Sequence, residues 1–116
     1  MTALSVIVPT RDSAATLEAC LRSIREQTVP VELVVVDNFS SDATPDVARR
    51  FASIFQQAGP ERSRQRNLGA ARAGGAYLLF VDSDMVLPRS AVAECLEQAA
   101  LGFRAAIIPE VSSGRG

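Results

Sequence analysis

The 116-residue sequence contains neither histidine nor lysine, so all twelve of its basic residues are arginines. The lack of lysine excludes sites built on a Schiff base or a P-loop lysine. The lack of histidine excludes histidine general bases and histidine metal ligands. The net charge of −1 gives no reason to expect a nucleic acid or an anionic membrane as a partner. Carboxylates, arginines and thiols make up the chemistry that remains.

Cysteines and long apolar runs are also scarce. Cys20 and Cys95 are too few for a disulfide framework, and both fall at apolar positions of predicted helices. We interpret them as small buried hydrophobic residues. No apolar run approaches the roughly 18 residues of a membrane-spanning helix. The N-terminus lacks the basic region of a signal peptide. We therefore expect a cytoplasmic protein without a transmembrane segment.

Short apolar runs alternate with segments of helical periodicity. This alternation predicts an α/β fold, a Rossmann-like, mostly parallel sheet with helices on both faces. We expect one domain over residues 1–110 and a polar tail over 111–116, where the chain is truncated. Residues 53–57 favour a strand over an extension of the preceding helix. The strands are expected at 3–9, 31–37, 53–57, 76–82 and 105–109, and the helices at 11–27, 44–51, 61–75 and from Pro88 or Ser90 onward.

Two helix starts have recognisable capping residues. Asp12 or Ser13 is expected to cap the first helix. Thr44 is expected to be the N-cap of the second helix, with Pro45 at its first helical position.

Polar groups follow three of the predicted strands, at the edge where open parallel sheets bind ligands. They are Pro9-Thr10-Arg11, Asp37-Asn38 and Asp82-Ser83-Asp84. The last group follows Tyr77–Val81, which looks like the most buried strand. The two aspartates of this group have no basic neighbour in the sequence, so their charges need compensation. If the strand geometry persists past Asp82, the carboxylates of the D-x-D triplet point the same way and suit Mg²⁺ or Mn²⁺. The alternative is a solvated turn.

Asp37 and three arginines are further candidates. Asp37 would accept hydrogen bonds from a nucleobase or ribose, or else cap local backbone amides. Arg62, Arg64 and Arg66 lie near the start of one predicted helix, where Arg62 and Arg66 share a face. They would meet ligand phosphate or base edges, or else form a solvated surface.

Three stretches in this order, SVIVPTRDSAATLEACLRSI, ELVVVDNFSSDAT and RNLGAARAGGAYLLFVDSDM, resemble the family 2 glycosyltransferases over nearly the whole chain. The resemblance implies the A-type glycosyltransferase fold and an inverting transfer from a nucleotide-diphosphate sugar to a sugar or lipid acceptor. It implies that Pro9, Thr10, Arg11 and Asp37 hold the base, that Arg66 lies near the nucleotide, that Asp82 lies near the ribose and the metal, and that Asp84 ligates Mg²⁺ or Mn²⁺.

Members of that family continue well beyond the last predicted strand, into a part that carries the acceptor site and the catalytic base. Glu110 is the last acidic residue here, and nothing in the sequence makes it the base. We therefore expect donor binding without transfer by this chain alone, and self-association through its truncated side. A non-catalytic nucleotide-binding module or an inactive truncated fragment is the alternative.

Two other classes fit less well. A haloacid-dehalogenase-type phosphatase would need a lysine and an earlier acidic triplet. A dinucleotide-binding domain would need G-x-G-x-x-G after the first strand.

Overall fold

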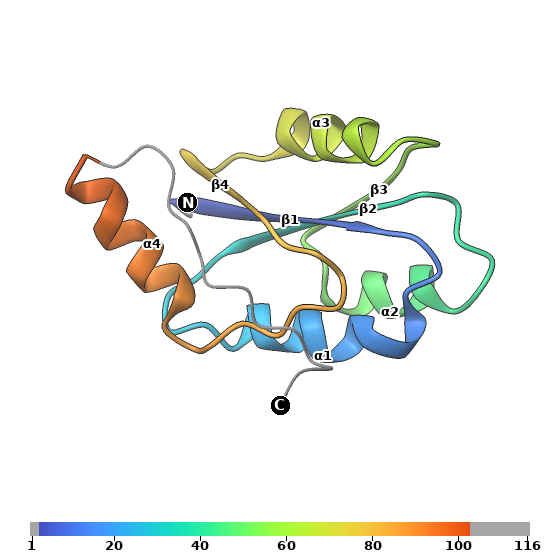
Figure 1. Cartoon of the computed structure of the whole chain (residues 1–116), viewed down its shortest axis with the longest axis horizontal. Helices are drawn as coiled ribbons and strands as arrows, with labels where there is room; N and C mark the ends of the chain where they lie inside the picture. Colours follow the sequence, from blue (N-terminus) through green and yellow to red (C-terminus); the bar gives the residue numbers. More distant parts are fainter. Residues whose placement is uncertain (1–2, 103–116) are drawn as a thin grey trace.

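The computed structural model describes residues 3–102, which form four strands and four helices in alternation (Figure 1). This order confirms the predicted α/β class, including the short strand for which the sequence also allowed a longer helix. The elements are β1 (Leu4–Thr10), α1 (Ala14–Arg25), β2 (Glu32–Asp37), α2 (Thr44–Phe51), β3 (Ile54–Gln57), α3 (Arg62–Arg72), β4 (Tyr77–Phe80) and α4 (Ala91–Ala100).

The described strands form one parallel sheet in the order β3-β2-β1-β4. Thr10, the last residue of β1, pairs in register with Asp37, the last residue of β2. Ile7 of β1 pairs with Phe80, the last residue of β4. Because the strands are parallel, their carboxyl ends meet at one edge of the sheet. The polar groups that follow β1, β2 and β4 therefore gather there, as the sequence predicts.

Helices cover both faces of the two central strands, which explains their near-continuous hydrophobic sequences. α1 and α2 lie on one side of the sheet and α3 on the other (Figure 1). The larger core cluster lies on the α1 side; fully buried in it are Val6, Val8, Leu17, Cys20, Leu21, Ile24, Leu33, Val35, Ala48 and Val92. Ile7, Val34 and Val36 form the smaller cluster on the α3 side. A Cβ atom at Gly69 of α3 would lie 2.5 Å from Ile7 Cγ2, so glycine allows this helix to approach the sheet.

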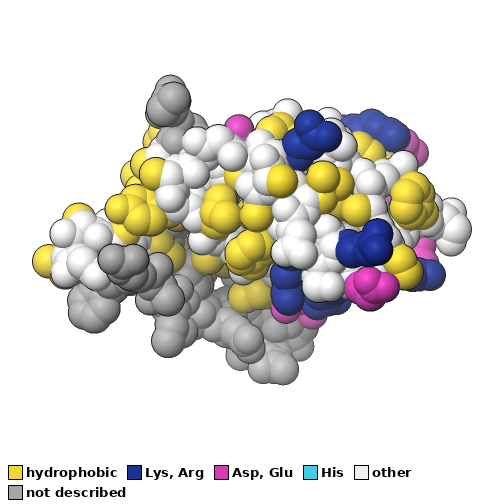
Figure 2. All heavy atoms as spheres, turned by 90° about the horizontal axis from the view of Figure 1, so that it is seen from above, with side chains coloured by type: hydrophobic (Ala, Val, Ile, Leu, Met, Phe, Trp, Pro, Cys, Tyr) yellow, Lys and Arg dark blue, Asp and Glu magenta, His cyan; other side chains and the backbone are white. Residues whose placement is uncertain are grey.

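β4 is not the most buried strand, contrary to the expectation from its sequence. Its side chains at Tyr77, Leu78 and Phe80 are 43%, 42% and 43% exposed. β4 forms one edge of the described sheet, and α3 packs over β1 and β2 instead. Figure 2 looks onto the α3 side and shows hydrophobic side chains gathered toward the α4 end, with most charged groups at the opposite end. The expected self-association stays a prediction, which this exposed strand supports.

The first two helices are capped differently from the prediction. Ser13 occupies the N-cap position of α1, but its hydroxyl group hydrogen-bonds with the backbone of Arg11 and does not cap the helix. The free N–H of Ala14 is instead satisfied by Asp42 Oδ2, at 3.2 Å, from the loop before α2. The N-cap of α2 is Ala43, so Thr44 is the first helical residue. The cap of α1 is thus supplied by a residue distant in sequence.

The expected strand at 105–109, Glu110 and the expected tail at 111–116 lie outside the described residues. Among the helices of residues 3–102, none has the length and apolar character needed to cross a membrane.

Candidate functional site

The loop after β2 folds around the carboxylate of Asp37, whose side chain is fully buried. Its Oδ1 accepts hydrogen bonds from Thr10 Oγ1 at 2.7 Å and Ser40 Oγ at 2.6 Å. Its Oδ2 accepts the backbone N–H of Ser40 at 2.8 Å. Donors within the chain thus stabilise this buried charge. The arrangement is the local capping that the sequence offered as the alternative role of Asp37, and its contact with a nucleobase stays a prediction.

The loops after β1 and β2 are also bonded to each other. The backbone N–H of Asp12 donates to Ser40 Oγ at 2.7 Å, and Asp12 Oδ1 accepts the backbone N–H of Ser41 at 2.9 Å. Asp12 and Phe39 have left-handed backbone conformations, with φ of 46° and 48°. Such conformations are uncommon outside glycine and persist where surrounding bonds hold them. The two loops therefore form one continuous surface at the sheet edge, joined by hydrogen bonds.

The three residues predicted at the end of β1 differ in accessibility. Pro9 and Thr10 are buried within the strand, and the hydroxyl group of Thr10 is bonded to Asp37. Arg11 lies just beyond the strand and is exposed. Arg11 is therefore the one of the three whose side chain reaches solvent at this edge.

Gln65 of α3 is a residue that the sequence analysis missed. It is 3% exposed, and its Nε2 donates to the carbonyl oxygens of Thr10 at 2.9 Å and Val36 at 2.8 Å. One amide group thereby joins α3 to the carboxyl ends of both central strands. A signal was present in the sequence, because Gln65 lies four residues before Gly69, on the face that packs against the sheet.

The acidic triplet forms a turn and does not extend β4. The strand ends at Phe80, and the backbone N–H of Met85 donates to the carbonyl oxygen of Asp82 at 3.0 Å, which closes a four-residue turn. The condition that strand geometry persists past Asp82 is therefore not met, and the spacing of Asp82 and Asp84 does not by itself direct them to one point. The side chain of Asp82 is 48% exposed, and Asp84 is exposed. Neither carboxylate is buried.

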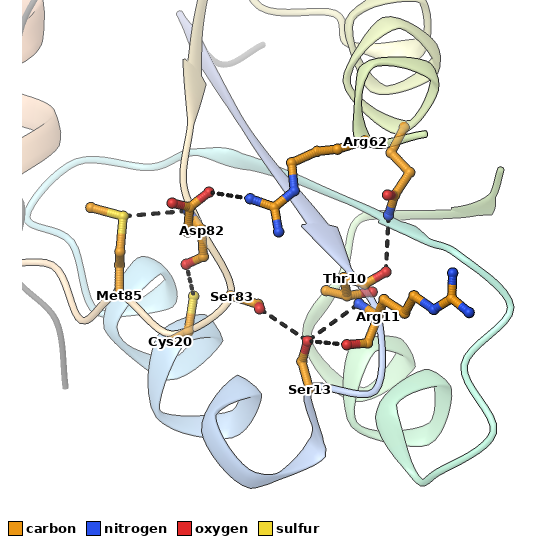
Figure 3. A network of polar contacts seen from close by, with 9 residues as sticks. Thr10, Arg11, Ser13, Cys20, Arg62, Asp82, Ser83 and Met85 are labelled. Atoms are coloured by element: carbon orange, nitrogen blue, oxygen red, sulfur yellow. Dashed lines mark hydrogen bonds and ion pairs between the residues drawn. The ribbon is translucent and has the colours of Figure 1, made fainter. Parts of the chain in front are cut away.

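Hydroxyl groups hold this turn against the start of α1. Ser83 Oγ donates to Ser13 Oγ at 3.0 Å, and Thr16 Oγ1 donates to the carbonyl oxygen of Ser83 at 3.1 Å. Figure 3 shows Ser83 and Ser13 facing each other between the two segments. The backbone of the acidic turn is thus positioned by polar contacts from another element.

Cys20 lies beneath the same turn. Its thiol donates to the carbonyl oxygen of Asp82 at 3.5 Å, as drawn in Figure 3. Burial, with smaller contributions from the carboxylates of Asp84 and Asp82, raises the pKa of the Cys20 thiol to about 12. Cys95 is buried as well, and burial raises the pKa of its thiol too. Both cysteines are therefore neutral core residues, as predicted.

A basic residue does lie beside the acidic turn, although none is near it in the sequence. Arg62 Nη1 is 3.4 Å from Asp82 Oδ1. Figure 3 shows the Arg62 side chain extending from the start of α3 toward Asp82, across the end of β1. The fold thus supplies part of the compensating charge. Arg66 is exposed on the same helix.

Asp82 and Asp84 fit a metal ion that keeps open coordination positions. Within residues 3–102, no group of three or more acidic, cysteine or histidine side chains is placed to hold a metal. A closed cage made by the described part of the protein is therefore excluded. Mg²⁺ and Mn²⁺ are commonly bound through one or two carboxylates together with waters and ligand phosphates. Two carboxylates on an accessible turn suit that mode of binding.

Comparison with known proteins agrees with this geometry. Residues 5–114 match the model of the glycosyl transferase family 2. Glycosyltransferase AglE of Haloferax volcanii is 34% identical over 93 residues, which cover 70% of this chain and 30% of that protein. The chain therefore spans about a third of the length of this relative.

Solved structures show the same architecture. The mannosyltransferase PcManGT from Pyrobaculum calidifontis, in complex with GDP-Man and Mn²⁺, is 31% identical with a TM-score of 0.77 and is matched over 84% of this chain and 32% of that chain. TarS 1-349 of S. aureus, in complex with UDP-GlcNAc, is 29% identical with a TM-score of 0.75, over 86% and 32% of the two chains. The family match, the parallel sheet and these shared structures establish that the chain belongs to glycosyl transferase family 2.

Proposed function

We propose that this chain binds the nucleotide-diphosphate part of a sugar donor, with a divalent cation, at the carboxyl edge of its sheet. The observation that carries the proposal is the convergence of three strand ends at one edge. Thr10 and Asp37 are paired there, and the turn that starts at Asp82 lies beside them, joined to α3 through Arg62. The proteins of known structure with this architecture include complexes with UDP-GlcNAc and with GDP-Man and Mn²⁺.

The ends of β1 and β2 would hold the nucleoside. A carboxylate has about four lone-pair positions, and Asp37 uses three of them for donors within the chain. The remaining position on Oδ2 suits an N–H group of a base, once the surrounding loop shifts enough to admit it. Pro9 and Thr10 would form the floor beneath the base. Arg11 and Arg66, both exposed, would contact the nucleotide from the sides.

The turn after β4 would hold the ribose and the metal. Asp82 is assigned to the ribose side and shares the cation with Asp84, the main metal ligand. When bound, Mg²⁺ or Mn²⁺ would offset the negative charge that develops on the leaving nucleoside diphosphate. The protein's part is to hold the turn still, through the contacts of Ser83 with Ser13 and Thr16.

Inverting transfer requires a base that deprotonates an acceptor hydroxyl group, so that its oxygen attacks the anomeric carbon from the side opposite the diphosphate. Among residues 3–102 we assign no such base and no site for the sugar or lipid acceptor. The proposal for this chain is therefore donor binding. Transfer would take place in a protein that also supplies the base and the acceptor site.

Calorimetric titration of the chain with UDP, GDP and dTDP, with and without Mn²⁺, tests the binding. We expect at least one diphosphate to bind more tightly with Mn²⁺, by about tenfold or more, because a metal-bridged diphosphate gains charge-assisted contacts. Asp84→Asn should remove the effect of the metal, whereas Asp46→Asn, a matched change of an exposed side chain on α2, should not. Equal binding with and without Mn²⁺ would contradict the metal role of Asp84.

The base contact is tested separately with the nucleosides themselves. Asp37→Ala should weaken nucleoside binding even without metal, while Asp84→Asn should leave it unchanged. If both substitutions act only when Mn²⁺ is present, Asp37 belongs to the metal site instead.

The limit to donor binding is tested with labelled nucleotide sugars, Mn²⁺ and a panel of sugar and lipid acceptors. We expect no acceptor-dependent product, although slow donor hydrolysis is compatible with the proposal. Robust transfer that Glu110→Gln abolishes would make this chain a complete catalyst.

A further inference from the structure

Arg62 lies where two charged partners of the proposed site meet. On the basis of the proposed function, we propose that Arg62 is a donor-binding residue that alternates between two anionic partners, Asp82 and the donor diphosphate. It pairs with Asp82 when the site holds no donor, and with the diphosphate when donor and cation are bound. This arrangement would make the site selective for a cation that arrives with a nucleotide diphosphate over a free cation.

The contact between Arg62 and Asp82 is weak enough for Arg62 to exchange Asp82 for another anion. Arg62 Nη1 and Asp82 Oδ1 are 3.4 Å apart, longer than the roughly 2.7–2.9 Å of a strong charge-assisted hydrogen bond. The two side chains are 61% and 48% exposed, so neither is fixed by burial. A guanidinium group has five N–H donors, and the ion pair with Asp82 involves one nitrogen. The others remain able to bind phosphate oxygens.

The position of Arg62 also matters. It is the first residue of α3, the helix that Gln65 ties to the ends of β1 and β2. The backbone of Arg62 is therefore anchored on the nucleoside side of the site. Its guanidinium group reaches the acidic turn on the other side (Figure 3). The diphosphate of a bound donor would lie between the nucleoside side and the acidic turn, within reach of this guanidinium group.

The charge of Arg62 should have opposite effects on binding of the cation alone and on binding of the cation together with a diphosphate. A free divalent cation at Asp82 would meet the positive charge of Arg62 and would have to displace its ion pair, which weakens cation binding. A diphosphate brings several negative charges, so the cation and the guanidinium group then both have an anionic partner. Arg62 should therefore oppose binding of the cation alone and favour binding of cation and diphosphate together. The affinity of each ligand should depend on the other, reciprocally.

An ordinary surface ion pair would behave differently. Exposed pairs contribute little, and removal of Arg62 would then leave both cation and nucleotide binding nearly unchanged. The two interpretations thus differ in what removal of Arg62 does. An ordinary ion pair predicts almost no change, whereas our proposal predicts tighter binding of the cation alone and weaker binding of the diphosphate.

The test compares Arg62→Gln with Arg64→Gln. Arg64 lies on the same helix, is exposed, and pairs with Glu61 at 3.5 Å, which favours the solvated surface that the sequence offered as its alternative. Its substitution therefore removes the same charge away from the acidic turn. Binding of Mn²⁺ alone is followed by the electron paramagnetic resonance signal of free Mn²⁺. Binding of UDP and GDP with Mn²⁺, and of uridine and guanosine without it, is followed by calorimetry. Thermal melting verifies that each variant is folded.

We expect Arg62→Gln to bind Mn²⁺ alone about two- to fivefold more tightly, because the cation then neither displaces an ion pair nor faces the positive charge of Arg62. It should bind the diphosphate with Mn²⁺ about tenfold more weakly, through loss of charge-assisted hydrogen bonds. Nucleoside binding should not change, and Arg64→Gln should match the wild type throughout.

If the wild type binds a diphosphate with Mn²⁺ but Arg62→Gln behaves like Arg64→Gln, the role of Arg62 is wrong and the proposed function stands. Weaker nucleoside binding by Arg62→Gln would also overturn the role, since it would place the residue at the base. If the wild type binds no diphosphate, the proposed function fails, and the role of Arg62 fails with it.

Discussion

β2 and β4 have similar sequences and different surroundings. Each is an apolar run that leads to an aspartate, yet β2 is buried along nearly its whole length and β4 is largely exposed. β2 has a strand on either side and helices over both faces. Among the described strands, β4 has only β1 beside it, and α3 packs mainly over β1 and β2. An apolar run thus predicts a strand well, but its position in the sheet decides how much of it is buried.

The same contrast extends to the two acids. Asp37 after β2 is fully buried and accepts three hydrogen bonds, while Asp82 after β4 is half-exposed and has one long contact with Arg62. We interpret the β2 end as largely preformed by its own hydrogen bonds, apart from the loop shift that admits a base, and the β4 end as the part that exchanges partners when a ligand binds. The contrast can be tested at the strands, at the acids and in the loop after β2.

The largest difference is expected between Leu33→Ala and Leu78→Ala. Leu33 in β2 is fully buried, and its truncation should lower the free energy of unfolding by about 2–5 kcal/mol, through lost burial and an unfilled cavity. Leu78 in β4 is 42% exposed, and its truncation should cost less than about 1 kcal/mol. Urea unfolding measures both. Equal losses would mean that β4 is covered in solution, as it would be by self-association.

A smaller difference is expected between Asp37→Asn and Asp82→Asn. An asparagine at 37 places an NH₂ group among the donors from Thr10 and Ser40, so about 1–3 kcal/mol should be lost. Asp82→Asn removes an exposed ion pair worth about 0–1 kcal/mol. Thermal unfolding of both variants provides the comparison. A larger loss at position 82 would reverse our view of which end is preformed.

The smallest effect is expected from Asp42, the exposed acid that caps α1 from the loop after β2. Hydrogen bonds from the hydroxyl and the backbone N–H of Thr44, the former being the larger cause, hold the pKa of Asp42 below its usual value. A lowered pKa in the folded state means that the stabilisation is present above the unfolded pKa, near 4, and is lost as pH falls through the folded value.

Asp42→Asn should therefore be slightly less stable than the wild type at about pH 7, and the difference should shrink as pH falls below about 4 and through the lowered pKa of Asp42. Urea unfolding at several pH values measures it, with Asp46→Asn as the control. A difference that persists at low pH would show that the capping does not depend on the charge.

The sequence predicted the order of elements because each depends on local pattern. Leu17, Leu21 and Ile24 mark one face of α1 by their spacing, and the β-branched run in β2 marks a strand buried on both faces. Neighbouring strand ends then follow from parallel pairing. The convergence of Thr10 and Asp37 was therefore predictable from sequence.

Contacts between distant segments were not predictable in this way. Arg62 and Asp82 are twenty positions apart, and their approach depends on how α3 is set across the sheet. The cap of α1 by Asp42 likewise depends on which loops the fold brings together. The turn at Asp82–Met85 is a local contact, and the sequence did offer a turn as the alternative for this triplet. Gln65 was identifiable as a polar residue on a buried helix face, but its two carbonyl partners were not.

The strand order has a consequence for how the chain folds as it is made. β1 is synthesised first but is central in the sheet, and Leu4 at its start pairs with Tyr77 of β4. β2 and β3 can add to one side of β1 early, while its other side waits until β4 has left the ribosome. An apolar edge of β1 thus stays open until β4 has emerged, and such edges invite pairing with other chains. The nascent chain should be most dependent on chaperones just before β4 emerges, and much less so once β4 has closed that edge.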